Sequence, residues 1–331
     1  MRKFNPEKLR SEINGALNLR NEIENIVDKL CSEGFKNIYW IGIGGTYASA
    51  HQTYIHMKEK SSLDINFENA SEYLTTGNKR IGKNTIAVIS SESGTTDEMV
   101  RAVKKLKKEG VTILGFIDTP NTPLSEMVDY CVSYFSYEQI KFYMVADRFM
   151  YNHGEFDDYY EYYEEMEKHL ADALVKVEED ADLFGKTFAL KHHKDDMHYF
   201  VGAGNMMGAT YSYAMCYWEE QHWLRTKSIH AAEFIHGCFE IIDRDSNVTI
   251  FVGEDSQRIL SERIVKLIPK ICGNYNIIDT KDYELKGISK KYRGSISHLV
   301  MRRICNRIDV YIEEINCHPM EIRRYYRQID Y

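Results

Sequence analysis

The chain has 331 residues, 44% of them hydrophobic and 28% charged, and its formal net charge is −8. This length predicts about two domains, and the composition is that of a soluble globular protein. The acidic balance and the lack of a dense basic patch argue against nucleic acid or an anionic membrane as a partner. No stretch approaches the ~18 apolar residues of a membrane span.

The N-terminal sequence and the spacing of the cysteines indicate the cellular compartment of the protein. Residues 1–20 carry charges throughout and lack the apolar segment of a secretory signal. The seven cysteines are widely spaced and form no C-x-x-C pair, so neither a disulfide framework nor a zinc site is indicated. We therefore expect a cytoplasmic protein that needs no metal and no other cofactor.

The first 30 residues are predicted to form an N-terminal helix. A strand at Ile38–Ile41 then enters a G-x-G turn and small residues that open a helix, and the same pattern recurs from His198 to Thr210. The copies start at residues 38 and 198, about half the chain apart, which indicates a duplicated domain. The first turn lacks the third glycine of a dinucleotide-binding motif and no P-loop is present, which argues against NAD and nucleotides.

Continuous apolar strands separated by helical patterns predict two doubly wound, flavodoxin-like parallel sheets in tandem, an α/β fold. The first domain is expected at 31–150, the second at 186–318, and a C-terminal tail at 319–331. The further predicted strands are Thr85–Ile89, Val111–Ile117 and Tyr130–Tyr134 in the first half, and Val248–Val252, Tyr275–Ile278 and His298–Val300 in the second.

The connecting segment 151–185 has few turn formers and many acids and tyrosines. We expect a long, partly exposed helix that packs between domains or subunits. For the tyrosines at 151–163, surface and interface packing is favoured over a stacking surface for a base or sugar.

The stretch SSESGTTDE, residues 90–98, follows the strand Thr85–Ile89 and leads into a helical pattern. The first turn of a helix has N–H groups without partners and favours an anion. Five hydroxyl residues and Gly94 accompany these groups. A helix cap needs only one hydroxyl, so we favour a phosphate site. Glu92 and Asp97 would repel phosphate unless they point away. The matching loop of the second half, residues 251–256, is acidic, so the two copies have diverged.

Gly44-Gly45-Thr46 and Ser91–Thr96 resemble the signature of sugar isomerase (SIS) domains. The tandem arrangement resembles the isomerase half of glucosamine-6-phosphate synthase and, more closely, the bacterial fructosamine-6-phosphate deglycases. The run Glu233–Ile242 and the ending from His318 through Arg323 to Tyr331 are similar to those of the deglycases.

The resemblance implies a set of functional residues. It assigns catalysis to Glu220, which would move a proton between C1 and C2, and to His236, which would assist ring opening from across a dimer interface. It thus implies a homodimer or higher homo-oligomer with shared active sites and a phosphosugar substrate. The implied phosphate-binding residues are Gly45, Thr46, Ser91, Ser93, Thr95 and Thr96, and the possible substrate-binding residues are Glu233 and Arg327.

Two departures from the family pattern limit this transfer. Arg327 stands where the synthase tail carries a lysine, and arginine cannot form a Schiff base. The sugar-contacting stretch of the synthase has no counterpart after Glu138. A metal site at His230, Glu233 and His236 is a less favoured interpretation, since no HExxH motif is present.

The resemblance implies cleavage of a 6-phosphorylated fructosamine into an aldose 6-phosphate and an amine. Two alternatives remain open: an aldose–ketose isomerase of an amino-sugar phosphate, and a non-catalytic phosphosugar-binding protein.

Overall fold

The computed structural model describes residues 1–330, and Tyr331 lies outside them. The chain divides into two compact units, and each is described by itself. We call Glu7–Ala171 the N-unit, and Met1–Pro6 together with the residues from Asp172 onward the C-unit.

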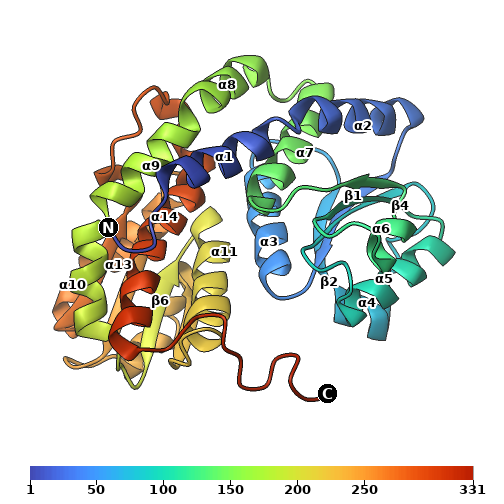
Figure 1. Cartoon of the computed structure of the whole chain (residues 1–331). Helices are drawn as coiled ribbons and strands as arrows, with labels where there is room; N and C mark the ends of the chain where they lie inside the picture. The colour runs from blue at the N-terminus through green and yellow to red at the C-terminus, as the bar shows by residue number, and fades with distance from the viewer. Residues whose placement is uncertain (331) are drawn as a thin grey trace. The chain divides into compact units, whose positions relative to one another are not determined.

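The N-unit has one parallel five-stranded sheet in the order β2-β1-β3-β4-β5 (Figure 1). This is the flavodoxin-like order, as the sequence predicts. Every residue of β1 and β3 is buried, which explains their uninterrupted apolar character. The strands are β1 (Asn37–Gly42), β2 (Ile65–Asn69), β3 (Thr85–Ser91), β4 (Thr112–Ile117) and β5 (Tyr130–Val132).

Helices and one π-helical turn complete the N-unit. Its apolar core lies where the sheet meets helices such as α5, whose Met99, Val103 and Leu106 are buried. The helices are α1 (Pro6–Leu17), α2 (Arg20–Glu33), α3 (Gly45–Lys58), α4 (Ala70–Thr76), α5 (Asp97–Lys108), α6 (Pro123–Met127), α7 (Glu138–Asn152), α8 (Tyr159–Glu165) and the π-helix Met166–Leu170.

The C-unit has a parallel four-stranded sheet in the order β7-β6-β8-β9. Its strands are β6 (His198–Gly202), β7 (Thr226–His230), β8 (Asn247–Val252) and β9 (Asn274–Asp279). Its helical elements are α9 (Ala171–Asp180), which starts at the unit boundary, α10 (Asp182–His192), α11 (Asn205–Ser212), the π-helix η2 (Tyr213–Glu219), α12 (Ala231–Phe234), α13 (Arg258–Ile271), α14 (Lys290–Asn316) and the 3-10 turns Cys238–Ile241 and Thr280–Asp282.

The strand predicted at His298–Val300 is wrong, because these residues lie inside the 27-residue helix α14. Buried residues recur every four positions along this helix, at Ile296, Val300, Ile304, Ile308 and Ile312. That period belongs to one face of an α-helix. A three-residue apolar run is too short to distinguish this period from that of a strand.

The tyrosine-rich segment is partly buried: Tyr160 is exposed and Tyr151 is partly exposed, whereas the other three tyrosines pack inside the N-unit. Tyr159, Tyr162 and Tyr163 are buried. The Arg148 guanidinium lies over the Tyr159 ring at 5.5 Å and donates to both carboxylate oxygens of Asp28, each at 2.6 Å. Hydrogen bonding and ring contacts thus fasten α8 to α2 and α7 within the N-unit.

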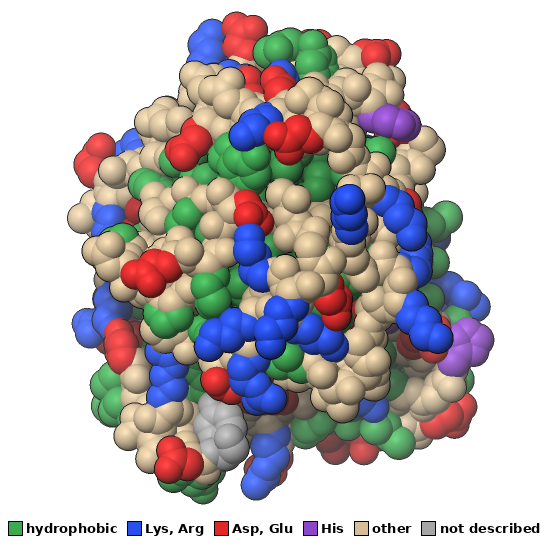
Figure 2. Space-filling view, turned by 90° about the vertical axis from the view of Figure 1, so that its right-hand side faces the viewer, with side chains coloured by type: hydrophobic (Ala, Val, Ile, Leu, Met, Phe, Trp, Pro, Cys, Tyr) green, Lys and Arg blue, Asp and Glu red, His purple; other side chains and the backbone are tan. Residues whose placement is uncertain are grey.

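Charged side chains of both signs are interspersed on the face shown in Figure 2, with lysines and arginines gathered near its middle. Among residues 1–330, no helix has both the length and the apolar character needed to cross a bilayer.

Candidate functional site

The carboxyl ends of β1 and β3 meet at one edge of the N-unit sheet, because these two strands are neighbours in the sheet. From β1 the chain continues to β2, which lies on one side of this pair of strands. From β3 it continues to β4, which lies on the other side. Such a switch point is where open α/β sheets bind ligands. The six predicted phosphate-binding residues lie at the end of β3, in the loop that follows it, and in the first turn of α3 after β1.

The serine-rich loop after β3 folds upon itself. The Ser91 hydroxyl oxygen accepts the Gly94 N–H at 3.1 Å, and the Ser93 hydroxyl oxygen accepts the Thr95 N–H at 3.3 Å. Thr96 is the N-cap residue of α5, yet its side chain makes no capping hydrogen bond. The structure therefore does not use the Thr96 hydroxyl as a helix cap, which was the competing interpretation of this loop.

Gly94 is required by the shape of this loop. Its φ is +63°, and a Cβ atom placed there would lie 2.0 Å from the Thr122 Oγ1 atom. The two acids that could repel an anion are both exposed to solvent. Asp97 pairs with Arg101 at 3.3 Å along the surface of α5. The donors of the loop can thus contact an anion, because the carboxylates of Glu92 and Asp97 lie in solvent and not inside the loop.

The glycine turn after β1 brings a second helix N-terminus to the same edge. Gly45 and Thr46 lie in the first turn of α3, whose N–H groups have no partner within the helix. The Thr46 hydroxyl donates to a Glu138 carboxylate oxygen at 3.0 Å. The Thr46 side chain is therefore bonded to α7, whereas its backbone N–H is one of the donors in the first turn of α3.

The segment before α7 has an unusual backbone. Ser136 and Tyr137 have φ values of +96° and +52°, a region that residues with side chains rarely occupy. Four residues into α7, the buried Lys141 ammonium contacts the Asp118 carboxylate at 2.8 Å, just beyond β4. Burial raises the pKa of Asp118, and Lys141 opposes that rise. Strained backbone is often found next to functional sites.

In the C-unit the equivalent helix is α11, and a carboxylate of the same chain occupies its N-terminus. The Asp255 carboxylate accepts the Asn205 N–H at the start of α11 at 2.8 Å, and it also accepts the Gln257 N–H at 2.9 Å. A Cβ atom on Gly204 would lie 2.4 Å from this carboxylate. An internal anion therefore lies at the helix N-terminus of the second copy, which gives the acidic loop of that copy a structural role.

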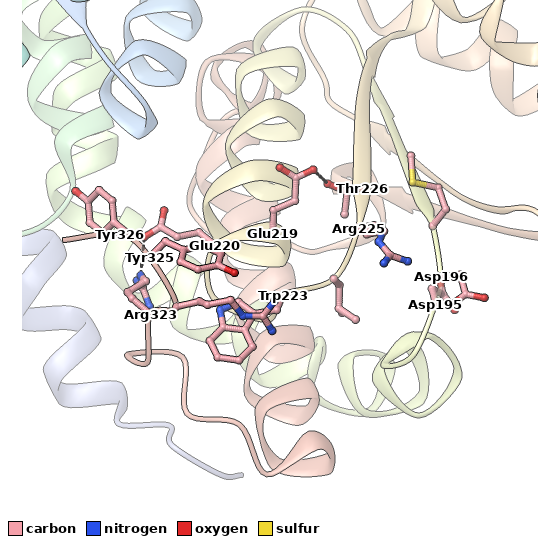
Figure 3. A pocket seen from close by; sticks show the side chains of 13 residues that line it. Asp195, Asp196, Glu219, Glu220, Trp223, Arg225, Thr226, Arg323, Tyr325 and Tyr326 are labelled. Carbon is pink, nitrogen blue, oxygen red and sulfur yellow. Dashed lines mark hydrogen bonds and ion pairs between the residues drawn. The ribbon is translucent and has the colours of Figure 1, made fainter. Parts of the chain in front are cut away.

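Glu220 lines a pocket of about 900 Å³ in the C-unit (Figure 3). The pocket lies at the amino edge of the sheet, because Met197 directly precedes β6 and Arg225 directly precedes β7. Its lining residues are Asp195, Asp196, Met197, Glu219, Glu220, Trp223, Leu224, Arg225, Thr226, Arg323, Arg324, Tyr325 and Tyr326.

The C-terminal tail contacts Glu220 through Arg323, whose Nε atom donates to the carboxylate at 2.8 Å. Trp223 fastens the tail, since its ring lies 4.2 Å from the His318 ring and 4.3 Å from the Arg324 guanidinium. Trp223 itself has a φ of +59°. The tail thus places a fixed positive charge beside the predicted catalytic carboxylate.

The other predicted residues lie elsewhere. His236 and Glu233 are exposed near α12 and do not line the Glu220 pocket, so one chain does not bring Glu220 and His236 together there. Arg327 is exposed and lies over the Tyr326 ring at 5.3 Å, and it is absent from the lining. The His230 Nδ1 atom accepts the Ala232 N–H and caps α12, which accounts for this histidine without a metal.

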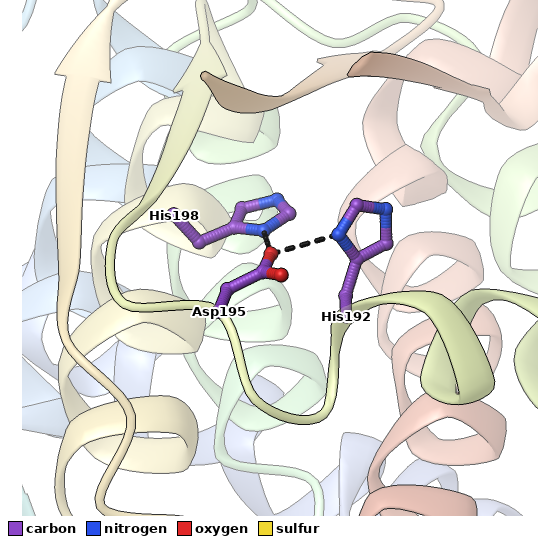
Figure 4. A group of neighbouring side chains, drawn as sticks. All are labelled: His192, Asp195 and His198. Carbon is purple, nitrogen blue, oxygen red and sulfur yellow. Dashed lines mark hydrogen bonds and ion pairs between the residues drawn. The ribbon is translucent and has the colours of Figure 1, made fainter. Parts of the chain in front are cut away.

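Within residues 1–330, His192, Asp195 and His198 are the group of potential metal ligands that the structure brings together (Figure 4). One Asp195 oxygen lies 2.7 Å from His192 Nδ1 and 2.8 Å from His198 Nδ1. These are hydrogen-bond distances, whereas two ligands of a tetrahedral zinc ion lie roughly 3.3 Å apart.

The far nitrogens of both rings also have partners, Asn276 for His192 and Thr249 for His198. The cluster is therefore a complete hydrogen-bonded network that ties α10 to β6, β8 and β9. Burial lowers the pKa of His198 to about 4, and its hydrogen bond to Asp195 only partly opposes this.

Sequence reasoning missed four residues of these sites: Glu138, Trp223, Asp255 and Arg323. Asp255 had a usable signal, since it lies in the acidic loop that replaces the serine-rich one. Arg323 and Trp223 had none, because their roles depend on the path of the tail across the C-unit.

Residues 34–149 match the SIS domain family. Over 325 residues the chain is 25% identical to fructosamine deglycase FrlB of Bacillus subtilis (strain 168), covering 95% of this chain and 98% of that protein. Over 307 residues it is 20% identical to fructoselysine 6-phosphate deglycase of Escherichia coli (strain K12), covering 91% and 88%.

A solved structure of a candidate phosphosugar isomerase from Bacillus subtilis has the same fold. Its TM-score is 0.89 at 22% sequence identity, and the match covers 98% of this chain and 100% of that one.

We predict that Asp255→Ala lowers the free energy of unfolding by about 1–3 kcal/mol, because it leaves the Asn205 and Gln257 N–H groups without their acceptor. Urea unfolding measures this loss. Asp245→Ala, which removes an exposed carboxylate of the same unit, is the matched control. Equal stability of the two variants would show that Asp255 is not a required acceptor.

The His198 network predicts acid sensitivity of the fold. The unfolded chain binds a proton at this residue below about pH 6.5, whereas the folded chain does so only near pH 4. The stability that the neutral ring contributes is therefore full above pH 6.5 and is lost as the pH falls towards 4, up to about 3 kcal/mol.

The measurement compares urea unfolding of the wild type and His198→Gln from pH 7 to 4.5. Buried His56 also has a lowered pKa, so the informative quantity is the difference between the two proteins. We expect the wild type to lose stability faster on acidification. Parallel pH curves would contradict the assignment.

Proposed function

We propose that this chain, whose N-unit contains a SIS domain, is a phosphosugar enzyme that cleaves a 6-phosphorylated fructosamine into an aldose 6-phosphate and an amine. The observation that carries the proposal is the serine-rich loop at the N-terminus of α5, where several hydroxyls accompany the donors of a helix end and the Thr96 hydroxyl does not cap the helix. Two relatives that match most of the chain bear deglycase names, which supports the assignment.

The proposed chemistry divides between the two units. Ser91, Ser93, Thr95 and Thr96, with the first turn of α3 at Gly45 and Thr46, bind the phosphate of the substrate. Glu220 acts as the carboxylate base, removing the C1 proton of the open-chain ketosamine to give an enaminol and returning it at C2. Water then adds to the C1 imine, its oxygen becomes the aldehyde oxygen, and the nitrogen leaves as the free amine.

Two further residues have proposed supporting roles. Arg323 holds the Glu220 carboxylate in a defined orientation through its 2.8 Å hydrogen bond. His236 is exposed, and we propose that it assists ring opening in the active site of a second copy of the chain in a homodimer or larger homo-oligomer.

Glu220→Gln should lower kcat for release of glucose 6-phosphate from a fructosamine 6-phosphate by roughly 10²–10⁴-fold, because the amide cannot accept the proton. The matched control is Glu219→Gln. That carboxylate lines the same pocket and accepts the Thr226 hydroxyl hydrogen at 2.7 Å. Normal turnover by Glu220→Gln would refute the assigned role.

Thr96→Val separates phosphate binding from helix capping. Since the Thr96 side chain makes no capping hydrogen bond, the free energy of unfolding should change by less than about 0.5 kcal/mol. Loss of a donor to a charged phosphate should weaken binding of glucose 6-phosphate about tenfold, measured by calorimetry. Thr75→Val, on α4, is the control. A large loss of stability with unchanged affinity would favour the cap.

An isomerase of amino-sugar phosphates could use the same loop and the same carboxylate. The product distinguishes the two activities. A deglycase releases a free amine in equal amount to the aldose 6-phosphate, whereas an isomerase keeps nitrogen and sugar joined.

A further inference from the structure

The segment that carries Glu220 is attached to buried polar side chains that lie outside the pocket lining. His222 is 5% exposed and Asp309 is 1% exposed, and neither lines the Glu220 pocket. The His222 Nε2 atom donates to one Asp309 carboxylate oxygen at 3.3 Å, and the Arg302 guanidinium donates to the other at 3.4 Å. Arg302 and Asp309 both belong to α14. Because a buried carboxylate is costly without such partners, the loss of either donor should loosen this cluster.

Arg302 also contacts the π-helix η2, which directly precedes Glu220. Its guanidinium lies 3.9 Å from the centre of the Tyr217 ring, within the range of a cation–π interaction. The Tyr217 carbonyl oxygen accepts the His222 N–H at 3.0 Å. Two residues earlier, the Met215 carbonyl oxygen accepts the Glu220 N–H at 3.0 Å. The main chain at Glu220 is therefore bonded to η2, and η2 is attached to α14 through Arg302.

The side chain and the main chain of Glu220 are held by different parts of the C-unit. The carboxylate contacts Arg323 of the tail, whereas the main chain is fixed two residues further on, where the His222 side chain bonds to α14. The next residue, Trp223, has a left-handed backbone, a conformation that persists only where its surroundings support it. His222 thus anchors the chain at the point where it turns away from Glu220.

We propose that His222 and Asp309 are positioning residues for Glu220. Their hydrogen bond fixes residues 220–223 to α14, and this holds the Glu220 carboxylate within reach of the C1 proton of the substrate. The inference rests on the proposed function, in which Glu220 is the base. Such placement matters for the rate, because a misplacement of about 1 Å can slow a reaction about 100-fold.

His222→Phe tests this role, because phenylalanine keeps an aromatic ring and removes the donor to Asp309. We expect kcat for release of glucose 6-phosphate to fall roughly 10–100-fold. The affinity for glucose 6-phosphate, measured by calorimetry, should stay the same, because the proposed phosphate-binding residues lie in the N-unit. Asp309→Asn, which leaves one amide oxygen for two donors, should lower kcat in the same direction.

Two further variants separate positioning from a general loss of stability. His222→Gln supplies an amide donor to Asp309 and should recover most of the lost kcat. Ile264→Ala creates a cavity in the apolar core of the same unit, away from His222, and should lower stability without lowering kcat. All variants are assayed at a temperature where circular dichroism shows them folded. Unchanged kcat in His222→Phe, or an equal loss in Ile264→Ala, would overturn the proposal.

Hydrogen exchange separates failure of this inference from failure of the proposed function. The amide hydrogens of residues 219–223 should exchange about tenfold faster in His222→Phe than in the wild type, because local opening no longer breaks the bond to Asp309. If this acceleration is found while the wild type cleaves no fructosamine 6-phosphate, the anchor stands and the deglycase function fails. If exchange in this segment is unchanged, the positioning role fails.

Discussion

The N–H groups in the first turn of a helix that follows a buried parallel strand need an acceptor, and the two units meet this need differently. In the C-unit the Asp255 carboxylate provides it, in contact with the N–H of Asn205. In the N-unit the corresponding edge carries hydroxyl side chains, and under the proposed function the phosphate of the substrate is the anion at that edge. The two copies of the fold thus carry different groups at the same edge of their sheets.

The proposed catalytic carboxylate of the C-unit lies at the opposite edge of its sheet, where ligands are less often found. The π-helix η2 ends at Glu219, which places Glu220 near the first residues of β6 and β7. The tail then supplies Arg323, and the Trp223 ring holds that tail between His318 and Arg324. The hydrogen-bonded network of His192, Asp195 and His198 lies at the same edge of the sheet, and its Asp195 also lines the pocket.

The central strands could be predicted from the sequence because both of their faces are buried, which makes them continuous apolar runs. The edge strands β2 and β7 could not, since INFEN and TKSIH mix polar and apolar residues. The false strand at His298–Val300 arose because three residues cannot reveal a helical period. At the candidate sites, the serine-rich loop was proposed from its local pattern and Glu220 from the spacing seen in the family that the chain resembles. Arg323 was not assigned a role, because the resemblance to the synthase tail points to Arg327. The contact of Arg323 with Glu220 depends on the path of the tail past Trp223.

The internal carboxylate of the C-unit also affects how each half responds to the surroundings. The donors at the start of α11 have the Asp255 carboxylate as their acceptor, so this helix end of the C-unit needs no phosphate ester. Under the proposed function, the N-unit gains stability from its ligand by mass action, in proportion to the logarithm of ligand concentration once binding is saturated. Under that proposal, substrate starvation removes the acceptor from the phosphate-binding edge of the N-unit and favours its local unfolding, whereas the start of α11 keeps its acceptor at every substrate concentration.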